Sequence, residues 1–253
     1  MQIYNLHTHT TLSDGSASIE YVIQKAKEKG YKLGISDHIF CGGINTLDAV
    51  ERYLDTLGRY EVLRGAEANI GEDFRLPDRL AYKLDYCIAS VHYYFNEHRE
   101  KEWLSSYFGN RAKHHNNYVP NYNKGLCEHY MEQILKMVEG TFKTQRVDIY
   151  GHPTVLPFYE DLGRTRFLVE WEDEMIGLCK KYQVALEVSG LWHEPNMQLV
   201  QKALRQGVKL SFGCDGHKLE EVCELGYVEK MIEVLGIRQE QCYKPATIMR
   251  DND

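Results

Sequence analysis

The sequence lacks long apolar runs and an excess of positive charge. No stretch of its 253 residues approaches the roughly 18 consecutive apolar residues of a membrane-spanning helix, so we expect no membrane partner. The formal net charge of −7 argues against binding of long nucleic acids, because proteins that bind them normally carry a basic surface. The first residues show no basic, apolar leader of the secretory type, and we therefore expect a cytoplasmic protein.

The seven cysteines are odd in number and include no C-x-x-C pair. Their spacing argues against a cysteine-based zinc site and indicates reduced thiols in a cytosolic protein. The sequence also lacks internal repeats, low-complexity tracts and linkers. A serine nucleophile is not supported, because there is no G-x-S-x-G motif and the consecutive Ser36, Asp37 and His38 cannot form a triad.

Strand-like and helix-like patterns alternate along the whole chain. Short apolar runs predict seven strands, at 2–7, 31–38, 60–67, 84–92, 146–152, 183–190 and 208–217. Apolar residues at helical spacing predict helices at 18–29, 47–57, 131–138, 168–178, 197–206 and 228–235, with a short helix near 79–82. Ser18 is a candidate cap, and Gly30, Gly58 and Gly207 are candidate stops. This alternation predicts one α/β domain over residues 1–253, either a parallel barrel or a doubly wound sheet.

Residues 93–127 interrupt this alternation with a polar segment that is rich in aromatic residues, Asn and His and has no clear period. Long irregular segments in compact domains are often functional, so an insertion or lid over the site is one interpretation. A solvated surface loop is the other.

Histidines and carboxylates follow six of the seven predicted strands. A single histidine at a strand end is usually structural, but equivalent ends of parallel strands meet at one rim of a barrel, where catalytic groups gather. Oxygen and nitrogen ligands without sulfur suit Zn, Mn or Fe, and the set is too large for one tetrahedral ion, so two or three divalent metal ions are implied. Such a centre is suited to hydrolysis of phosphate esters. The side chains are His7, His9, Asp37, His38, Glu67, His92, His152, Asp215 and His217.

The segments "HTHTTLSDG", "ISDH", "GAE", "SVH", "YGH" and "GCDGH", in this order, resemble the motifs of the polymerase-and-histidinol-phosphatase (PHP) superfamily. The resemblance extends from residue 5 to about residue 217. It implies a distorted (β/α)7 TIM-like barrel with a trinuclear metal centre, and an enzyme that hydrolyses phosphate esters.

The resemblance also implies individual roles. His7, His9, Glu67 and Asp215 would hold one metal ion, Glu67, His92 and His152 a second, and Asp14, His38 and His217 a third. A hydroxide between the metals would attack phosphorus, with Glu67 bridging two ions. Asp215 or His217 would protonate the leaving alcohol as a general acid.

The length and the segment "EVSGL" resemble the histidinol-phosphatase branch, whose phosphate-binding arginines follow the "GH" and "SGL" motifs. Here the corresponding segments, "GHPTVLPFY" and "SGLWHEPN", contain no arginine. We expect a phosphomonoesterase that acts on a small phosphorylated metabolite. A substrate similar to histidinol phosphate is one of the possibilities. The candidate substrate-binding residues are His193, Arg111 and Arg164, and Trp192 is a candidate for stacking on a substrate ring.

Two alternatives stay open. The protein could be a nuclease or phosphodiesterase acting on short nucleotides, since some members of the superfamily degrade nucleic-acid ends. It could also be a metal-binding module without catalysis, in which the ions stabilise the fold.

Overall fold

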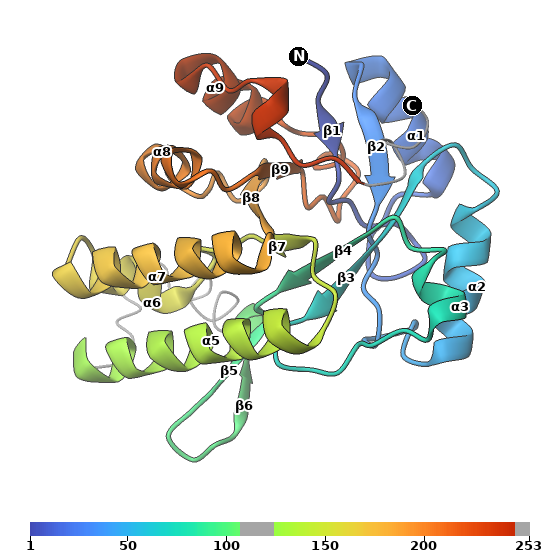
Figure 1. Cartoon of the computed structure of the whole chain (residues 1–253). Coiled ribbons are helices and arrows are strands. Elements are labelled where there is room, and N and C mark those ends of the chain that lie inside the picture. Colours follow the sequence, from blue (N-terminus) through green and yellow to red (C-terminus); the bar gives the residue numbers. More distant parts are fainter. Residues whose placement is uncertain (107–123, 246–253) are drawn as a thin grey trace.

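A computed structural model describes residues 1–106 and 124–245 of the chain (Figure 1). Seven parallel strands form one sheet in the order β1-β2-β3-β4-β7-β8-β9. The two edges of this sheet approach each other, because the Leu6 N–H donates to the Phe212 carbonyl and the Asp215 N–H to the His7 carbonyl, each at 2.8 Å. The sheet is therefore a nearly closed barrel. Its strands are β1 (Tyr4–Asn5), β2 (Lys32–Ile35), β3 (Leu63–Asn69), β4 (Tyr86–Ser90), β7 (Ile149–Gly151), β8 (Ala185–Ser189) and β9 (Leu210–Gly213).

Helices cover the outside of the barrel, with α1–α3 on one side and α5–α9 on the other (Figure 1). They are α1 (Ile19–Lys29), α2 (Leu47–Leu57), α3 (Asp78–Ala81), α5 (Lys124–Thr144), α6 (Pro157–Leu162), α7 (Arg166–Tyr182), α8 (Met197–Gln206) and α9 (Gly226–Leu235), followed by the 3-10 helix η2 (Gln239–Gln241). The Ser18 hydroxyl accepts from the Tyr21 N–H and begins α1, and Gly30 ends it with a left-handed φ of 72°. Among the described residues, no helix is both long and apolar enough to span a bilayer.

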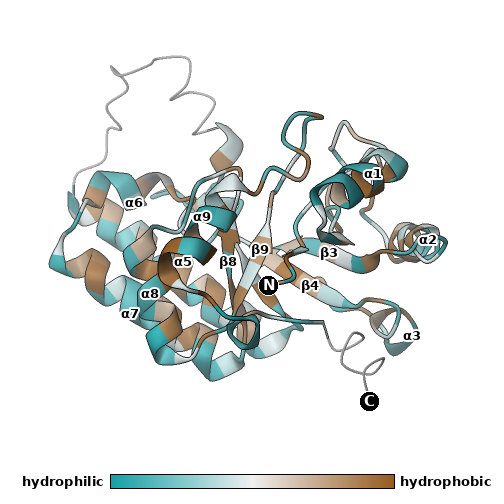
Figure 2. Cartoon of the chain, turned by 90° about the horizontal axis from the view of Figure 1, so that it is seen from above, coloured by the Kyte–Doolittle hydropathy of each residue, from teal (hydrophilic) through white to brown (hydrophobic). Residues whose placement is uncertain are grey.

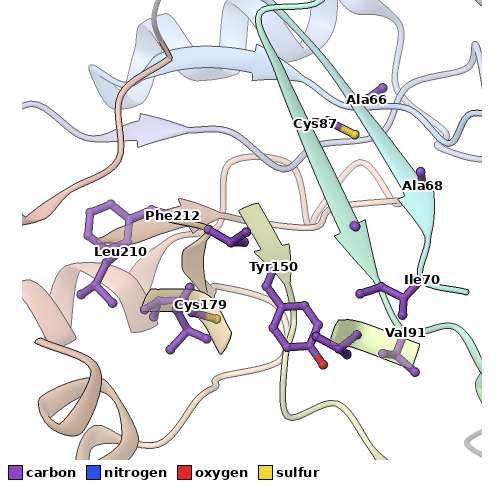
Figure 3. Packing of buried hydrophobic residues seen from close by; sticks show 14 of the residues in the cluster. Ala66, Ala68, Ile70, Cys87, Val91, Tyr150, Cys179, Leu210 and Phe212 are labelled. Carbon is purple, nitrogen blue, oxygen red and sulfur yellow. The ribbon is translucent and has the colours of Figure 1, made fainter. Parts of the chain in front are cut away.

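The main hydrophobic core lies between the strands and these helices. Strand β8 is largely hydrophobic, and the helices carry hydrophilic and hydrophobic stripes (Figure 2). Outward-facing strand residues such as Ala66, Cys87 and Phe212 belong to this core together with Cys179 of α7 (Figure 3). All seven cysteines are free thiols, as the sequence predicts.

A second, smaller core fills the barrel itself. It contains Leu6, Tyr86, Ile88, Ile149 and Ala185. The Tyr86 hydroxyl donates to the Leu6 carbonyl at 2.6 Å and so links β4 to the end of β1. Because side chains alternate along a strand, Tyr86 and Ile88 point inward while Cys87 points outward. The barrel interior is thus packed below the polar rim.

The segment predicted to be irregular, 93–127, is partly regular, so that prediction was wrong in part. Strands β5 (Tyr93–Phe95) and β6 (Lys101–Trp103) pair as an antiparallel hairpin, and α5 already begins at Lys124. Three-residue strands are too short to show a period of two in the sequence. Residues 107–123 lie outside the described part of the chain.

Candidate metal centre

Glu67 lies at the centre of the carboxyl end of the barrel. It extends from β3 and is almost completely buried, with 1% of its surface exposed. Five histidine nitrogens lie 3.1–3.4 Å from its two carboxylate oxygens: His7 Nε2, His9 Nε2 and His38 Nδ1 face Oε2, and His92 Nε2 and His152 Nε2 face Oε1. One carboxylate therefore stands between two sets of imidazoles, as a bridging ligand would.

The other predicted ligands complete these sets. Asp215 Oδ1 lies 3.3 Å from His7 Nε2 and 3.2 Å from His9 Nε2. Asp14 Oδ2 lies 3.7 Å from His38 Nε2 and 3.5 Å from His217 Nε2. Three groups offer donor atoms within 4.8 Å of one another: His7, His9 and Glu67; His38, Glu67 and His92; and His9, Asp14, His38 and His217.

The chemistry of these donors fits bound metal ions. Several buried ligand atoms have no hydrogen-bond partner among the described residues: His7 Nε2, His9 Nδ1 and Nε2, His38 Nδ1, and both oxygens of Glu67. Buried polar atoms are normally hydrogen-bonded, and leaving several unpaired at one place is costly. Imidazole nitrogens and carboxylate oxygens that converge in this way are the arrangement that a cation stabilises.

Neighbouring groups orient three of the imidazoles. His7 Nδ1–H donates to Glu187 Oε1 at 2.7 Å, and His92 Nδ1–H donates to Asn69 Oδ1 at 2.7 Å. His217 Nδ1–H donates to the Asp215 carbonyl at 3.1 Å. Each contact leaves Nε2 with a free lone pair that points into the cluster, which is how metal-binding histidines are usually held.

Charge keeps both central carboxylates ionised. Burial alone would raise the pKa of Asp215 and of Glu67, but the adjacent histidines, His7 first among them, lower both well below the ordinary value. Burial would likewise lower the pKa of His7, yet the charges of Glu187, Asp215 and Glu67 outweigh it and raise that pKa. Burial dominates for His38, whose pKa falls to about 4.

Two candidate ligands have unusual backbone conformations. His152 has a φ of 27° and Asp215 a φ of 51°, both in the left-handed range that L-residues other than glycine adopt uncommonly. Backbone strain of this kind often occurs at functional sites.

Sequence reasoning missed Glu187, which lies in the middle of β8 and is fully buried. Its Oε1 accepts from His7, and its Oε2 accepts from the His152 backbone N–H at 2.5 Å. A charged residue inside the apolar segment "VALEVS" was an available signal, since a buried glutamate almost always has a partner. Asp37, considered among the strand-end ligands, accepts instead from the Thr10 N–H and hydroxyl and from the Ser13 hydroxyl, and so holds the loop after His9.

A cleft of about 240 Å³ opens over the cluster. Seven of the predicted ligands line it, together with Val91, Leu104, Ser105, Val155 and Trp192. The candidate substrate-binding residues lie elsewhere or beyond the described chain. His193 is exposed and stacks on Tyr227, Arg164 is exposed, and neither lines the cleft, while Arg111 lies outside the described residues. Their role in substrate binding stays a prediction.

A family model described as the PHP domain matches residues 5–190 of the chain. The chain belongs to the PHP family. The match confirms the resemblance inferred from the motifs. Six of the seven barrel strands carry predicted ligands at or just after their carboxyl ends. Asp215 and His217 lie beyond the matched residues.

Solved structures of similar fold include two histidinol phosphatases. A candidate histidinol phosphatase, HisK, from Listeria monocytogenes has a TM-score of 0.66 at 15% identity, with 89% of this chain and 99% of that chain covered. Histidinol phosphate phosphatase from Lactococcus lactis, in complex with Zn, L-histidinol and phosphate, has a TM-score of 0.62 at 14% identity, with 94% and 95% covered. At these identities the likeness shows the fold, and it confirms the predicted TIM-like barrel of this PHP domain.

A relative in sequence is the DNA polymerase/3'-5' exonuclease PolX of Bacillus subtilis (strain 168). It is 27% identical over an alignment of 231 residues, and the match covers 85% of this chain and 34% of PolX. The chain thus spans about a third of the length of that relative.

Proposed function

We propose that this PHP domain is a metal-dependent phosphomonoesterase that acts on a small phosphorylated metabolite. The observation that carries the proposal is the convergence of five imidazole nitrogens on the two oxygens of Glu67. Among the described residues, the three that face Oε2 have no hydrogen-bond partner. A centre of this kind suits phosphate ester hydrolysis. Membership of the PHP family and the fold shared with histidinol phosphatases support the same reaction class.

We assign His7, His9, Glu67 and Asp215 to a first ion, Glu67, His92 and His152 to a second, and Asp14, His38 and His217 to a third. When bound, divalent ions supply Lewis acidity toward phosphoryl oxygens and lower the pKa of water. Zn, Mn and Fe all suit the donor set. The protein's own contribution is to hold these ligands in place through Glu187, Asn69 and the Asp215 carbonyl.

The leaving alcohol needs a proton, and His217 is better placed to give it than Asp215. Both oxygens of Asp215 are engaged, Oδ1 with the histidines and Oδ2 with the Trp192 indole N–H at 2.6 Å. His217 lines the cleft. Burial would lower the pKa of His217, but Asp14 and Asp215 raise it to about 9. His217 can act as general acid when no third ion occupies its Nε2.

The test combines metal analysis with phosphate release from an aryl phosphate in the presence of Mn or Zn. We expect two or three ions per chain, and a loss of at least about 100-fold in activity for His9→Ala and Asp215→Asn. His129→Ala is the matched control, because His129 is an exposed histidine outside the centre. Metal-loaded protein without phosphatase activity on a broad panel of monoesters would contradict the proposal.

A phosphodiesterase acting on short nucleotides is the second candidate, and the similarity to a protein named as a 3'-5' exonuclease favours it. Comparison of a phosphomonoester with a phosphodiester of the same alcohol separates the two activities. Tight metal binding without turnover of either ester would indicate a non-catalytic metal-binding module.

A further inference from the structure

The cleft is lined by apolar side chains as well as by predicted metal ligands. Apart from the predicted ligands, it is lined by Val91, Leu104, Ser105, Val155 and Trp192, of which only Ser105 is polar. Leu104 follows the hairpin β5–β6 directly and is 5% exposed, and Val91 follows β4 and is 2% exposed. Two separate segments therefore place largely buried aliphatic side chains along the cleft beside the metal centre.

Trp192 is held in this lining by a specific contact. Its indole N–H donates to Asp215 Oδ2 at 2.6 Å, so the ring is tied to a predicted metal ligand. Even so, 42% of the Trp192 surface is exposed. A large aromatic surface that is fixed in place and accessible from the cleft is well suited to pack against an apolar or aromatic group.

The described lining of the cleft has no charged side chain outside the proposed metal sets. It contains neither Lys nor Arg, and its three carboxylates, Asp14, Glu67 and Asp215, all belong to the proposed metal sets. With ions bound, no carboxylate in this lining is left to pair with an ammonium group. Placing an unpaired charge against an apolar wall is strongly unfavourable.

We propose that the substrate is a phosphomonoester of an uncharged, apolar alcohol, whose carbon skeleton packs on Trp192, Leu104 and Val155 while its phosphate faces the metal ligands. This inference rests on the proposed function and narrows it to a substrate class. It makes Trp192 a specificity-determining residue that also positions Asp215.

The first experiment compares two primary alkyl phosphates, 2-phenylethyl phosphate and O-phosphoethanolamine. We expect kcat/KM to be about 10- to 100-fold higher for the phenylethyl ester, mainly through a lower KM, because its ring buries apolar surface and its alcohol carries no charge. In parallel, calorimetry measures the binding of 2-phenylethylphosphonate and 2-aminoethylphosphonate to the Zn-loaded protein, with the same order of affinities expected.

Variants of Trp192 separate its two roles. Trp192→Ala should reduce the preference in kcat/KM for 2-phenylethyl phosphate over O-phosphoethanolamine to below about threefold. Trp192→Phe should keep most of the preference in KM but lower kcat, because the ring remains while the N–H to Asp215 is lost. Trp103→Ala is the control, since Trp103 on β6 is similarly exposed, at 40%, but does not line the cleft. It should leave the preference within twofold of the unaltered protein.

The outcomes distinguish this inference from the proposed function. Hydrolysis with equal or better use of phosphoethanolamine, or a preference that survives Trp192→Ala, would overturn the inference and leave the phosphatase intact. Selective binding of the phenylethylphosphonate without hydrolysis of any monoester would support the apolar specificity and contradict the proposed reaction.

Discussion

Glu187 accepts hydrogen bonds from two predicted metal ligands but belongs to none of the proposed metal sets. One of its oxygens accepts from the His7 imidazole and the other from the His152 backbone N–H. A carboxylate behind an imidazole fixes the ring orientation and makes Nε2 a better ligand. Because Glu187 is fully buried, no water can take its place.

We predict that Glu187→Gln lowers the affinity for Zn by about 10- to 100-fold. The amide cannot accept from both His7 and His152, since its NH2 group would face one of the two N–H donors. Competition with a chromophoric chelator measures this change. Glu61→Gln, at an exposed position, is the control and should bind Zn as the unaltered protein does. Equal affinity in the two variants would contradict the role assigned to Glu187.

Glu194 predicts a pH dependence of stability. Burial raises the pKa of its carboxyl to about 8 from an ordinary value of 4.5, and the Thr154 hydroxyl donates to it. The folded protein retains this proton after the unfolded chain has lost it. The stability from Glu194 is therefore fully present below pH 4.5 and lost as the pH rises through about 8.

Glu194→Gln should remove this dependence. We expect the free energy of unfolding of the variant, relative to the unaltered protein, to increase from pH 5 to pH 9, by up to about 5 kcal/mol. Urea denaturation at pH 5, 7 and 9 measures the difference. A difference that stays constant across this range would show that Glu194 ionises normally.

At the scale of elements, the interior faces of β2, β3 and β4 pack together because Gly34 and Gly65 leave room for the side chain of Tyr86. Tyr86 of β4 extends across the barrel, and a Cβ atom added to Gly65 of β3 would lie 2.2 Å from its ring. Gly34 of β2 is equally close to the Tyr86 hydroxyl. Gly65 and Glu67 share one face of β3, so this packing also sets the position of the bridging carboxylate.

Gly65→Ala should therefore destabilise the fold by about 1–3 kcal/mol, through overpacking in the barrel. It should also weaken Zn binding, since β3 must shift. Thermal denaturation and Zn titration measure the two effects. Gly140→Ala is the matched control: nothing lies within 4 Å of the added Cβ on α5, and the change should stabilise by up to about 1 kcal/mol. Unchanged stability of the Gly65 variant would refute the packing argument.

At the scale of the whole molecule, the proposed metal sets connect six of the seven barrel strands. Their ligands lie on or just after β1, β2, β3, β4, β7 and β9, and β8 adds Glu187 behind them. Ions bound here would link segments that are far apart in the sequence. They would bind the folded protein and not the unfolded chain, and so stabilise the fold.

Removal of the metal should accordingly lower the melting temperature. At a free ion concentration 1,000 times Kd the stabilisation is about 4 kcal/mol, which corresponds to roughly 10 °C for a domain of this size. Calorimetry with and without EDTA measures it. The His9→Ala variant should melt at nearly the same temperature with and without EDTA. If EDTA leaves the melting temperature of the unaltered protein unchanged, this would argue against a bound metal centre.

The sequence by itself determined the seven barrel strands, most of the helices and the positions of the candidate ligands. Helix α1 begins at Ser18 and ends before Gly30 as predicted, because a cap and a left-handed glycine act on neighbouring backbone groups. Histidines and carboxylates at successive strand ends predicted a shared rim, because parallel strands in one barrel bring equivalent ends together.

Only the tertiary structure decided how the candidate ligands at that rim are oriented and which residues they contact. The contact between His7 and Glu187 joins residues 180 positions apart, and Trp192 reaches Asp215 across 23 positions. The packing of separate elements also decides which histidines face each oxygen of Glu67. It likewise places Leu104 in the lining of the cleft beside them. Local patterns fix helices and strands because their hydrogen bonds are local, whereas orientation within a site depends on strand register and core packing, which distant residues set together.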